Sequence, residues 1–143
     1  VAVAMGCTLH PEIRDIEGRD NHRMPPDGTL AEKFGMRHIV SLTQGGVFHD
    51  VMGTTDIMTN SLHGQGIMDV SDRIVIDGYA PDGTPEAIYV KDAIGFTLSV
   101  QWHPEWQAGV DPVSRKLFTA FGHAAREWAS RDIHSTQSLR KSA

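Results

Sequence analysis

The sequence predicts a mixed α/β fold, because strand-like and helix-like apolar patterns alternate along one chain of 143 residues. Short segments rich in β-branched residues recur between residues 38 and 102, a Pro-Asp-Gly turn joins two of them, and a longer segment with helical spacing follows Pro112. Hydrophobic residues make up 40% and charged residues 22% of the chain, which is near the globular average and argues against extensive disorder. One domain over residues 1–143 is the simplest organisation.

The N-terminal segment is expected to be mostly loop. Val1 to Met5 is apolar and runs into Gly6, as the end of a helix runs into its C′ glycine, so we expect the chain to begin inside an element. Residues 8–33 hold several prolines, glycines and charges, and one short helical turn is expected at residues 30–34.

The next segment is expected to supply two strands. Residues 38–42 alternate polar and apolar side chains and include β-branched residues, which favours a strand. A short helix is expected at residues 48–52 and a second strand at residues 56–60. That strand leads into residues 61–66, where two glycines indicate an exposed corner.

A hairpin is predicted from residue 73 to residue 91. The segments 73–79 and 87–91 flank Ala80 to Thr84, in which Pro-Asp-Gly provides a fixed φ, a local side-chain hydrogen bond and then a positive φ. Within this hairpin, Glu86 is expected to be a solvated turn residue.

The C-terminal third is expected to add one strand and one helix. The apolar segment 96–102 reads as a strand that stops at His103-Pro104, since proline has no N–H for a ladder. Pro112 suits the first turn of a helix, and apolar residues repeat from there at helical spacing as far as Trp128. Residues 129–143 are small and charged and are expected to be a frayed tail.

Charge and cysteine content exclude several classes of partner. The net charge of −5 argues against nucleic acid or an anionic membrane as a partner, and no apolar run approaches the roughly 20 residues of a membrane span. We therefore expect a soluble cytoplasmic protein. A single cysteine, Cys7, among eight scattered histidines gives no closed zinc motif, so neither a metal site nor another cofactor is expected.

The strongest local signal for chemistry is Gln-Trp-His-Pro-Glu at residues 101–105. Residues i and i+2 of an extended chain point to the same side, so His103 and Glu105 can face one cleft. A carboxylate bonded to one imidazole nitrogen would orient the ring and leave the other nitrogen free to take a proton from a nucleophile. On spacing alone, a polar exit from a strand is the commoner meaning of this pattern.

These residues resemble a known family. Gln101 to Trp106 is similar to the His-x-Glu signature of class I, triad-type glutamine amidotransferases, whose nucleophile is a cysteine on a strand-to-helix elbow. Asn-Ser-Leu-His-Gly-Gln-Gly at residues 60–66 and the hairpin at residues 80–87 narrow the resemblance to the γ-glutamyl-γ-aminobutyrate hydrolases of putrescine degradation, of the peptidase C26 type.

The resemblance implies a fold and a reaction. The implied fold is the flavodoxin-like class I glutamine amidotransferase fold, of which the N-terminal strands and the nucleophile elbow lie just before Val1. The implied reaction is hydrolysis of a small-molecule γ-glutamyl amide to glutamate and γ-aminobutyrate through a thioester, with His103 as the base and Glu105 as its orienter. The chain by itself is then expected to be inactive.

The resemblance also implies a substrate-binding loop. Its Ser-Leu corner helps to hold the glutamyl group, and the residues assigned to substrate binding here are Asn60, Ser61, Leu62, His63 and Gln65. A loop braced by its own hydrogen bonds, with no substrate contact, is an equally good interpretation. His38 could line the same cleft, but a strand histidine is more often structural, and it is left out of the catalytic set.

Cys7 does not have the surroundings of a nucleophile. An elbow requires a buried strand before the cysteine, a glycine two residues after it and a following helix N-terminus that lowers the thiol pKa. Cys7 has six residues before it, Thr8-Leu9 after it, and Pro11 soon afterwards. We therefore expect Cys7 to be a small buried hydrophobic residue.

Two other functions stay open from the sequence. One is a glutaminase that passes ammonia to a synthase partner, and the other is a non-catalytic scaffold or pseudoenzyme. A homo-oligomer is compatible with the sequence, and a sheet that lacks its N-terminal strands is expected to expose an edge that can pair with another copy.

Overall fold

The computed structural model describes the backbone of residues 1–141 and the side chains of residues 1–131. Three helices, two 3-10 helices and seven strands make up this part of the chain. In order they are η1 (Val3–Met5), β1 (Leu9–His10), η2 (Ile13–Asp15), α1 (Leu30–Lys33), β2 (His38–Leu42), α2 (Val47–Met52), β3 (Asp56–Thr59), β4 (Gly66–Ile67), β5 (Ile74–Tyr79), β6 (Pro85–Val90), β7 (Ser99–Val100) and α3 (Pro112–Lys141).

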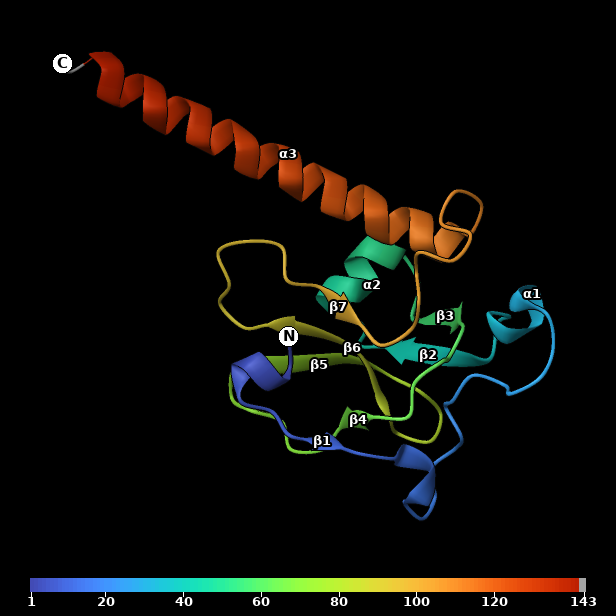
Figure 1. Ribbon diagram of the computed structural model, residues 1–143. Helices are drawn as coiled ribbons and strands as arrows, with labels where there is room; N and C mark the ends of the chain where they lie inside the picture. Colours follow the sequence, from blue (N-terminus) through green and yellow to red (C-terminus); the bar gives the residue numbers. More distant parts are fainter. Residues whose placement is uncertain (142–143) are drawn as a thin grey trace.

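Five of the strands form one sheet in the order β3-β2-β5-β6-β7, and β1 pairs with β4 in a separate two-stranded sheet. Helices α2 and α3 lie on one face of the larger sheet, and the β1–β4 pair lies on the opposite side (Figure 1). The mixed α/β class is confirmed. Every strand pair in the described part is antiparallel, so the parallel strands typical of a flavodoxin-like sheet are not among those described here.

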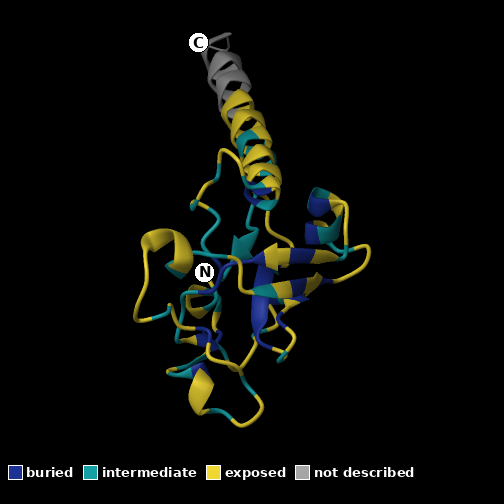
Figure 2. Cartoon of the chain, turned by 90° about the vertical axis from the view of Figure 1, so that its right-hand side faces the viewer, coloured by how far each residue is buried: buried dark blue, intermediate teal, exposed yellow. Residues whose placement is uncertain are grey.

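Strand β6 separates two apolar clusters, because it is covered on both faces. Ala87 packs with Phe48, Trp102 and other residues of α2, α3 and the sheet, whereas its neighbour Ile88 packs on the other face with Cys7. Figure 2 shows the buried residues concentrated in the sheet, whereas residues 125–131 of α3 are exposed. Successive side chains of a strand point to opposite faces, so a strand covered on both sides is apolar or paired at almost every position.

Helix α2 begins against a buried carboxylate. The side chain of Asp77, on β5, accepts a hydrogen bond from the amide of Phe48 at 2.7 Å and is only 2% exposed. A Cβ on Gly46 would lie 2.1 Å from Asp77 Oδ1, so only glycine lets the chain pass this close to the carboxylate. This contact fixes α2 on the sheet.

Most predicted elements are confirmed, with differences near the C-terminus. The strands expected at residues 38–42 and 56–60, the helical turn after residue 30 and the hairpin around Gly83 are present. The strand expected at residues 96–102 is reduced to Ser99–Val100. Residues 129–141, expected to be a frayed tail, continue α3, and residues 142 and 143 lie outside the described part.

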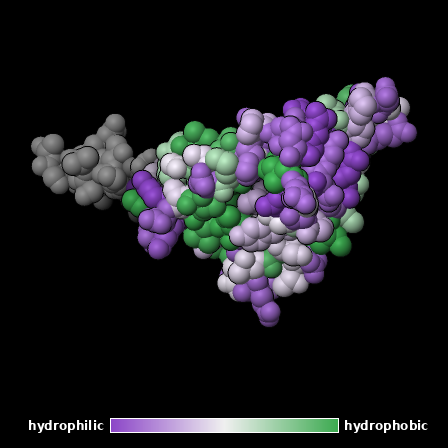
Figure 3. Space-filling model, turned by 90° about the horizontal axis from the view of Figure 1, so that it is seen from below, coloured by the Kyte–Doolittle hydropathy of each residue, from purple (hydrophilic) through white to green (hydrophobic). Residues whose placement is uncertain are grey.

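The surface is mixed in character. Figure 3 shows a hydrophobic area beside a strongly hydrophilic one on the face seen from below. The exposed apolar side chains include Ile94 at 84% and Phe121 and Trp128 at 52% each, and these three border one surface hollow. Among the described residues, no helix is both long enough and apolar enough to cross a membrane.

Candidate active site

The imidazole of His103 and the carboxylate of Glu105 are brought together just after β7. Their Nδ1 and Oε1 atoms are 2.7 Å apart. A carboxylate accepts, so Nδ1 carries the proton and Nε2 presents a lone pair. The His103 side chain is 43% exposed.

The contact with His103 favours the ionised form of Glu105. Partial burial raises the pKa of the Glu105 carboxyl, but the His103 hydrogen bond, a backbone amide and the His103 charge together bring that pKa below its ordinary value. An ionised Glu105 can both orient the imidazole and stabilise its protonated form.

Asn60 holds the backbone of His103 with two hydrogen bonds. Its Oδ1 accepts from the His103 amide at 2.8 Å, and its Nδ2 donates to the His103 carbonyl at 3.0 Å. Asn60 is 5% exposed and directly follows β3, one edge strand of the sheet. Its hydrogen bonds therefore connect the end of β3 to the segment that follows β7, the other edge strand. Of the five residues assigned to substrate binding, Asn60 is the one whose side chain bonds to His103.

Ser61 and His63 are engaged inside the protein. Ser61 is 1% exposed, and its hydroxyl donates to the carbonyl of His22 at 2.9 Å. His63 Nδ1 lies 2.8 Å from the carbonyl of Gln65, and its Nε2 lies 3.2 Å from Glu86 Oε1. The side chain of Leu62 is half-buried and Gln65 is exposed.

Glu86 is buried at the centre of three histidines, which we call the Glu86 cluster (Glu86, His22, His38 and His63). Its Oε1 lies 3.3 Å from His22 Nδ1, 3.4 Å from His38 Nε2 and 3.2 Å from His63 Nε2. The expectation that Glu86 is a solvated turn residue is wrong, since its side chain is 0% exposed. It lies on β6, an inner strand of the sheet, and not in the turn.

In this cluster the carboxylates and the histidines each favour the charged form of the other. Burial raises the pKa of Glu86, but the three histidines lower it by more, so the carboxyl is ionised. Burial lowers the pKa of His22, but Glu86 and Asp82 raise it above its ordinary value. Burial likewise raises the pKa of Asp82, whereas hydrogen bonds from the amides of Asp20 and Thr84 and from side chains lower it to about 2.

No local pattern in the sequence predicts this cluster. His22 lies in an irregular loop, and 64 positions separate it from Glu86, so no local spacing connects them. The donor atoms of His22, His38 and Glu86 all lie within 4.8 Å of one another, a spacing that could hold a metal ion. The one hint in the sequence is its composition, with eight histidines in 143 residues.

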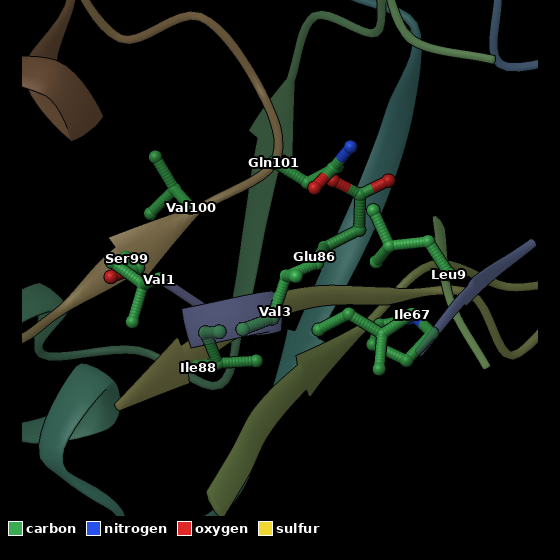
Figure 4. Close-up of a pocket in the computed structure, with 11 residues that line it drawn as sticks. Val1, Val3, Leu9, Ile67, Glu86, Ile88, Ser99, Val100 and Gln101 are labelled. Atoms are coloured by element: carbon green, nitrogen blue, oxygen red, sulfur yellow. The ribbon is translucent and has the colours of Figure 1, made fainter. Parts of the chain in front are cut away.

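Two hollows lie near these groups. The first, of about 290 Å³, is mainly apolar, and Figure 4 shows Leu9, Ile67 and Ile88 around it with Glu86 and Gln101 at one end. The second is lined by Asn60, His103 and Trp106 among others, and Trp106 stacks on Phe34 with ring centroids 4.6 Å apart. The second hollow is the candidate active site, because it is lined by His103, whose side chain is 43% exposed, and by the Asn60 side chain that holds it.

Cys7 lies elsewhere, in the apolar cluster on the other face of β6. It is 5% exposed and packs with Ile74, Ile88 and Val90. Its Sγ accepts from the amide of Ser71 at 3.4 Å. These surroundings agree with the expectation of a small buried hydrophobic residue.

Comparisons with known proteins agree on one family. The peptidase C26 family model matches residues 1–105. γ-Glutamyl-γ-aminobutyrate hydrolases from Escherichia coli and Shigella sonnei are each 34% identical over 122 residues, which is 85% of this chain and 48% of those proteins. The chain therefore spans about half the length of these curated relatives.

A solved structure supports the same fold. It comes from Thermoplasma acidophilum, is provisionally assigned as a GMP synthase subunit a protein, and matches with a TM-score of 0.60. The match has 16% sequence identity and covers 94% of this chain and 55% of that one. It supports a partial class I glutamine amidotransferase fold.

Proposed function

Because the chain belongs to the peptidase C26 family, we propose that it supplies the base and orienter of a cysteine-dependent hydrolase that cleaves γ-glutamyl amides. The observation that carries this proposal is the 2.7 Å contact between Nδ1 of the half-exposed His103 and Glu105. The nucleophile is a cysteine outside residues 1–143, on strands that complete a flavodoxin-like sheet.

In this reaction His103 moves the protons. Its Nε2 takes the thiol proton, the thiolate attacks the γ-carbonyl carbon, and the imidazolium then gives that proton to the leaving amine as the C–N bond breaks. A water molecule, deprotonated by the same nitrogen, attacks the resulting thioester, the C–S bond breaks to give free glutamate, and the imidazolium returns its proton to the leaving thiolate. Glu105 stabilises the imidazolium that forms twice in this cycle.

Roles for the remaining predicted residues follow from their contacts. Asn60 positions His103, and Ser61 and His63 brace the loop, because their polar groups are already bonded within the protein. Leu62 and Gln65 keep surface available for the substrate. Phe34 and Trp106 form an aromatic wall beside His103, with the Phe34 and His103 ring centroids 5.8 Å apart.

The substrate we propose is γ-glutamyl-γ-aminobutyrate, after the name of the two relatives that share 34% identity. The test is glutamate release from this compound and from glutamine, by the protein encoded by the whole gene and by the 143-residue chain. Iodoacetamide labelling with peptide mapping identifies the reactive cysteine.

We expect the whole-gene protein to favour γ-glutamyl-γ-aminobutyrate, to lose activity on alkylation and to be labelled outside residues 1–143. Cys7→Ala is the matched control and should keep its activity. Hydrolysis by the 143-residue chain that is abolished by labelling Cys7 would overturn the proposed position of the nucleophile. A preference for glutamine would instead favour a glutaminase.

A further inference from the structure

We propose that the Glu86 cluster is a binding site for one divalent transition-metal ion of the Zn²⁺ type. Within the cluster, the ligand atoms of His22, His38 and Glu86 lie within 4.8 Å of one another, and two imidazoles with one carboxylate suit Zn²⁺, Co²⁺ and Ni²⁺ better than Mg²⁺ or Ca²⁺. It lies outside the His103–Glu105 pair, and its role is separate from the proposed hydrolysis.

The distances fit a shared ion. In a tetrahedral site with metal–ligand bonds of about 2.0–2.1 Å, neighbouring ligand atoms are about 3.3 Å apart. The distances from Glu86 Oε1 to the nitrogens of His22, His38 and His63 are 3.3, 3.4 and 3.2 Å. Glu86 Oε1 therefore stands at the ligand–ligand separation from His22 and His38, and these three ligand atoms lie within 4.8 Å of one another, whereas His63 is outside that group.

Outer partners orient two of these imidazoles toward Glu86. His22 Nε2 lies 2.9 Å from the Asp82 carboxylate, and His63 Nδ1 lies 2.8 Å from the Gln65 carbonyl. Both partners only accept, so each of these nitrogens carries the ring proton. His22 Nδ1 lies 3.3 Å from Glu86 Oε1 and 3.1 Å from Ser61 Oγ, whose own proton goes to the His22 carbonyl. Without an ion this nitrogen carries a proton, and a bound metal ion would take the place of that proton.

This carboxylate–histidine–ligand arrangement is the usual second shell of a metal site. Asp82 holds His22 in the tautomer that a ligand needs, and the backbone of Gln65 does the same for His63. The Asp82 side chain is itself only 3% exposed, so the outer contact is built into the core.

Burial adds a second reason for an ion. The exposed fractions of the side chains are 1% for His22, 0% for Glu86, 9% for His63 and 14% for His38. Glu86 Oε2 and His38 Nε2 have no hydrogen-bond partner among the described residues. A buried carboxylate with unmet bonding capacity is costly, and a bound cation removes that cost.

The closed site points to a structural ion. Through His22 it would fasten the irregular loop that follows η2 to the sheet. Through Glu86 it would brace the segment that carries His103, because the Glu86 carbonyl accepts from the amide of Gln101 at 2.8 Å.

The test uses the purified chain after treatment with a chelator. We expect one Co²⁺ to bind per chain with the strong visible absorption of a tetrahedral site, and Zn²⁺ to displace it and raise the melting temperature. Metal analysis of untreated protein gives a readout that needs no variant. An Asp82→Asn change should weaken Co²⁺ binding by about 10–100-fold, and Glu86→Gln by more.

His123→Gln, an exposed position on α3, is the matched control and should bind Co²⁺ like the parent chain. Circular dichroism establishes that each variant is folded. Absence of bound metal in untreated protein, together with no visible band at equimolar Co²⁺, would overturn the proposal and leave protons on His22 and His63 as the cations of the cluster.

Discussion

The imidazole of His103 is fixed from two directions by neighbouring side chains. Glu105 bonds to its ring at 2.7 Å, and Asn60 bonds to both its backbone amide and its carbonyl. The first contact sets the tautomer, and the second sets the place of the residue after β7. Geometry held by both kinds of contact is what a general base needs.

Asn60→Ala should destabilise the protein by about 1–3 kcal/mol, because it removes both hydrogen bonds and leaves buried backbone groups without partners. Chemical denaturation measures this loss as a lower denaturant midpoint. Asn21→Ala, on the exposed loop, is the control and should change stability by less than about 0.5 kcal/mol. Equal effects of the two changes would show that the clamp does not stabilise the fold.

Glu105 should titrate below its ordinary value of 4.5. A carboxyl whose pKa is lowered on folding contributes stability above the unfolded pKa, and that contribution disappears as the pH falls through the folded pKa. Carbon NMR of the Glu105 carboxyl measures this titration directly. In His103→Gln the pKa of Glu105 should move up toward 4.5, and an unchanged value would contradict the ion pair.

The His103–Glu105 pair could be predicted from the sequence because its two members are two residues apart in an extended segment. The Glu86 cluster could not, since its members come from a loop, two strands and a corner. The prediction that Glu86 is solvated is wrong for the same reason. The sequence pattern locates the Pro-Asp-Gly turn, but it does not show that His22 and His63 contact the Glu86 side chain.

Among the elements, the hairpin of β5 and β6 was predicted well because turn chemistry is local, with Gly83 at a φ of 82°. β7 was predicted too long. Its apolar pattern spans residues 96–102, but only Ser99 and Val100 pair with β6, because the amide of Val90 is bonded instead to the Thr97 hydroxyl. An apolar pattern predicts burial of a segment, but it does not show how many of its residues form hydrogen bonds with the neighbouring strand.

Asp77→Ala should lower the stability of the sheet–α2 contact by about 1–3 kcal/mol, since it leaves the buried Phe48 amide without its acceptor. Asp50→Ala is the matched control in the first turn of α2, because the Asp50 side chain is 75% exposed. Thermal or chemical unfolding of the two variants measures the difference. A loss as large for Asp50→Ala would mean that general helix electrostatics, and not the buried contact, holds α2.

At the scale of the whole molecule, the described chain has a five-stranded antiparallel sheet with α2 and α3 on one face and a separate two-stranded sheet on the other side, and the chain spans about half the length of its curated relatives. The sequence predicted the mixed α/β class and most strand positions. Strand order and the antiparallel pairing come from contacts between distant segments, which a single sequence does not show. The hydrolase proposal requires that this half bring His103 to a cysteine on other strands.

The most direct test of that claim is kcat/KM for γ-glutamyl-γ-aminobutyrate hydrolysis by the protein encoded by the whole gene, compared with its His103→Ala variant. His123→Ala serves as the control. We predict a loss of more than about 10³-fold for His103→Ala and a change of less than about twofold for His123→Ala. A His103→Ala variant that keeps kcat/KM within about tenfold of the parent would contradict the assignment of His103 as the base.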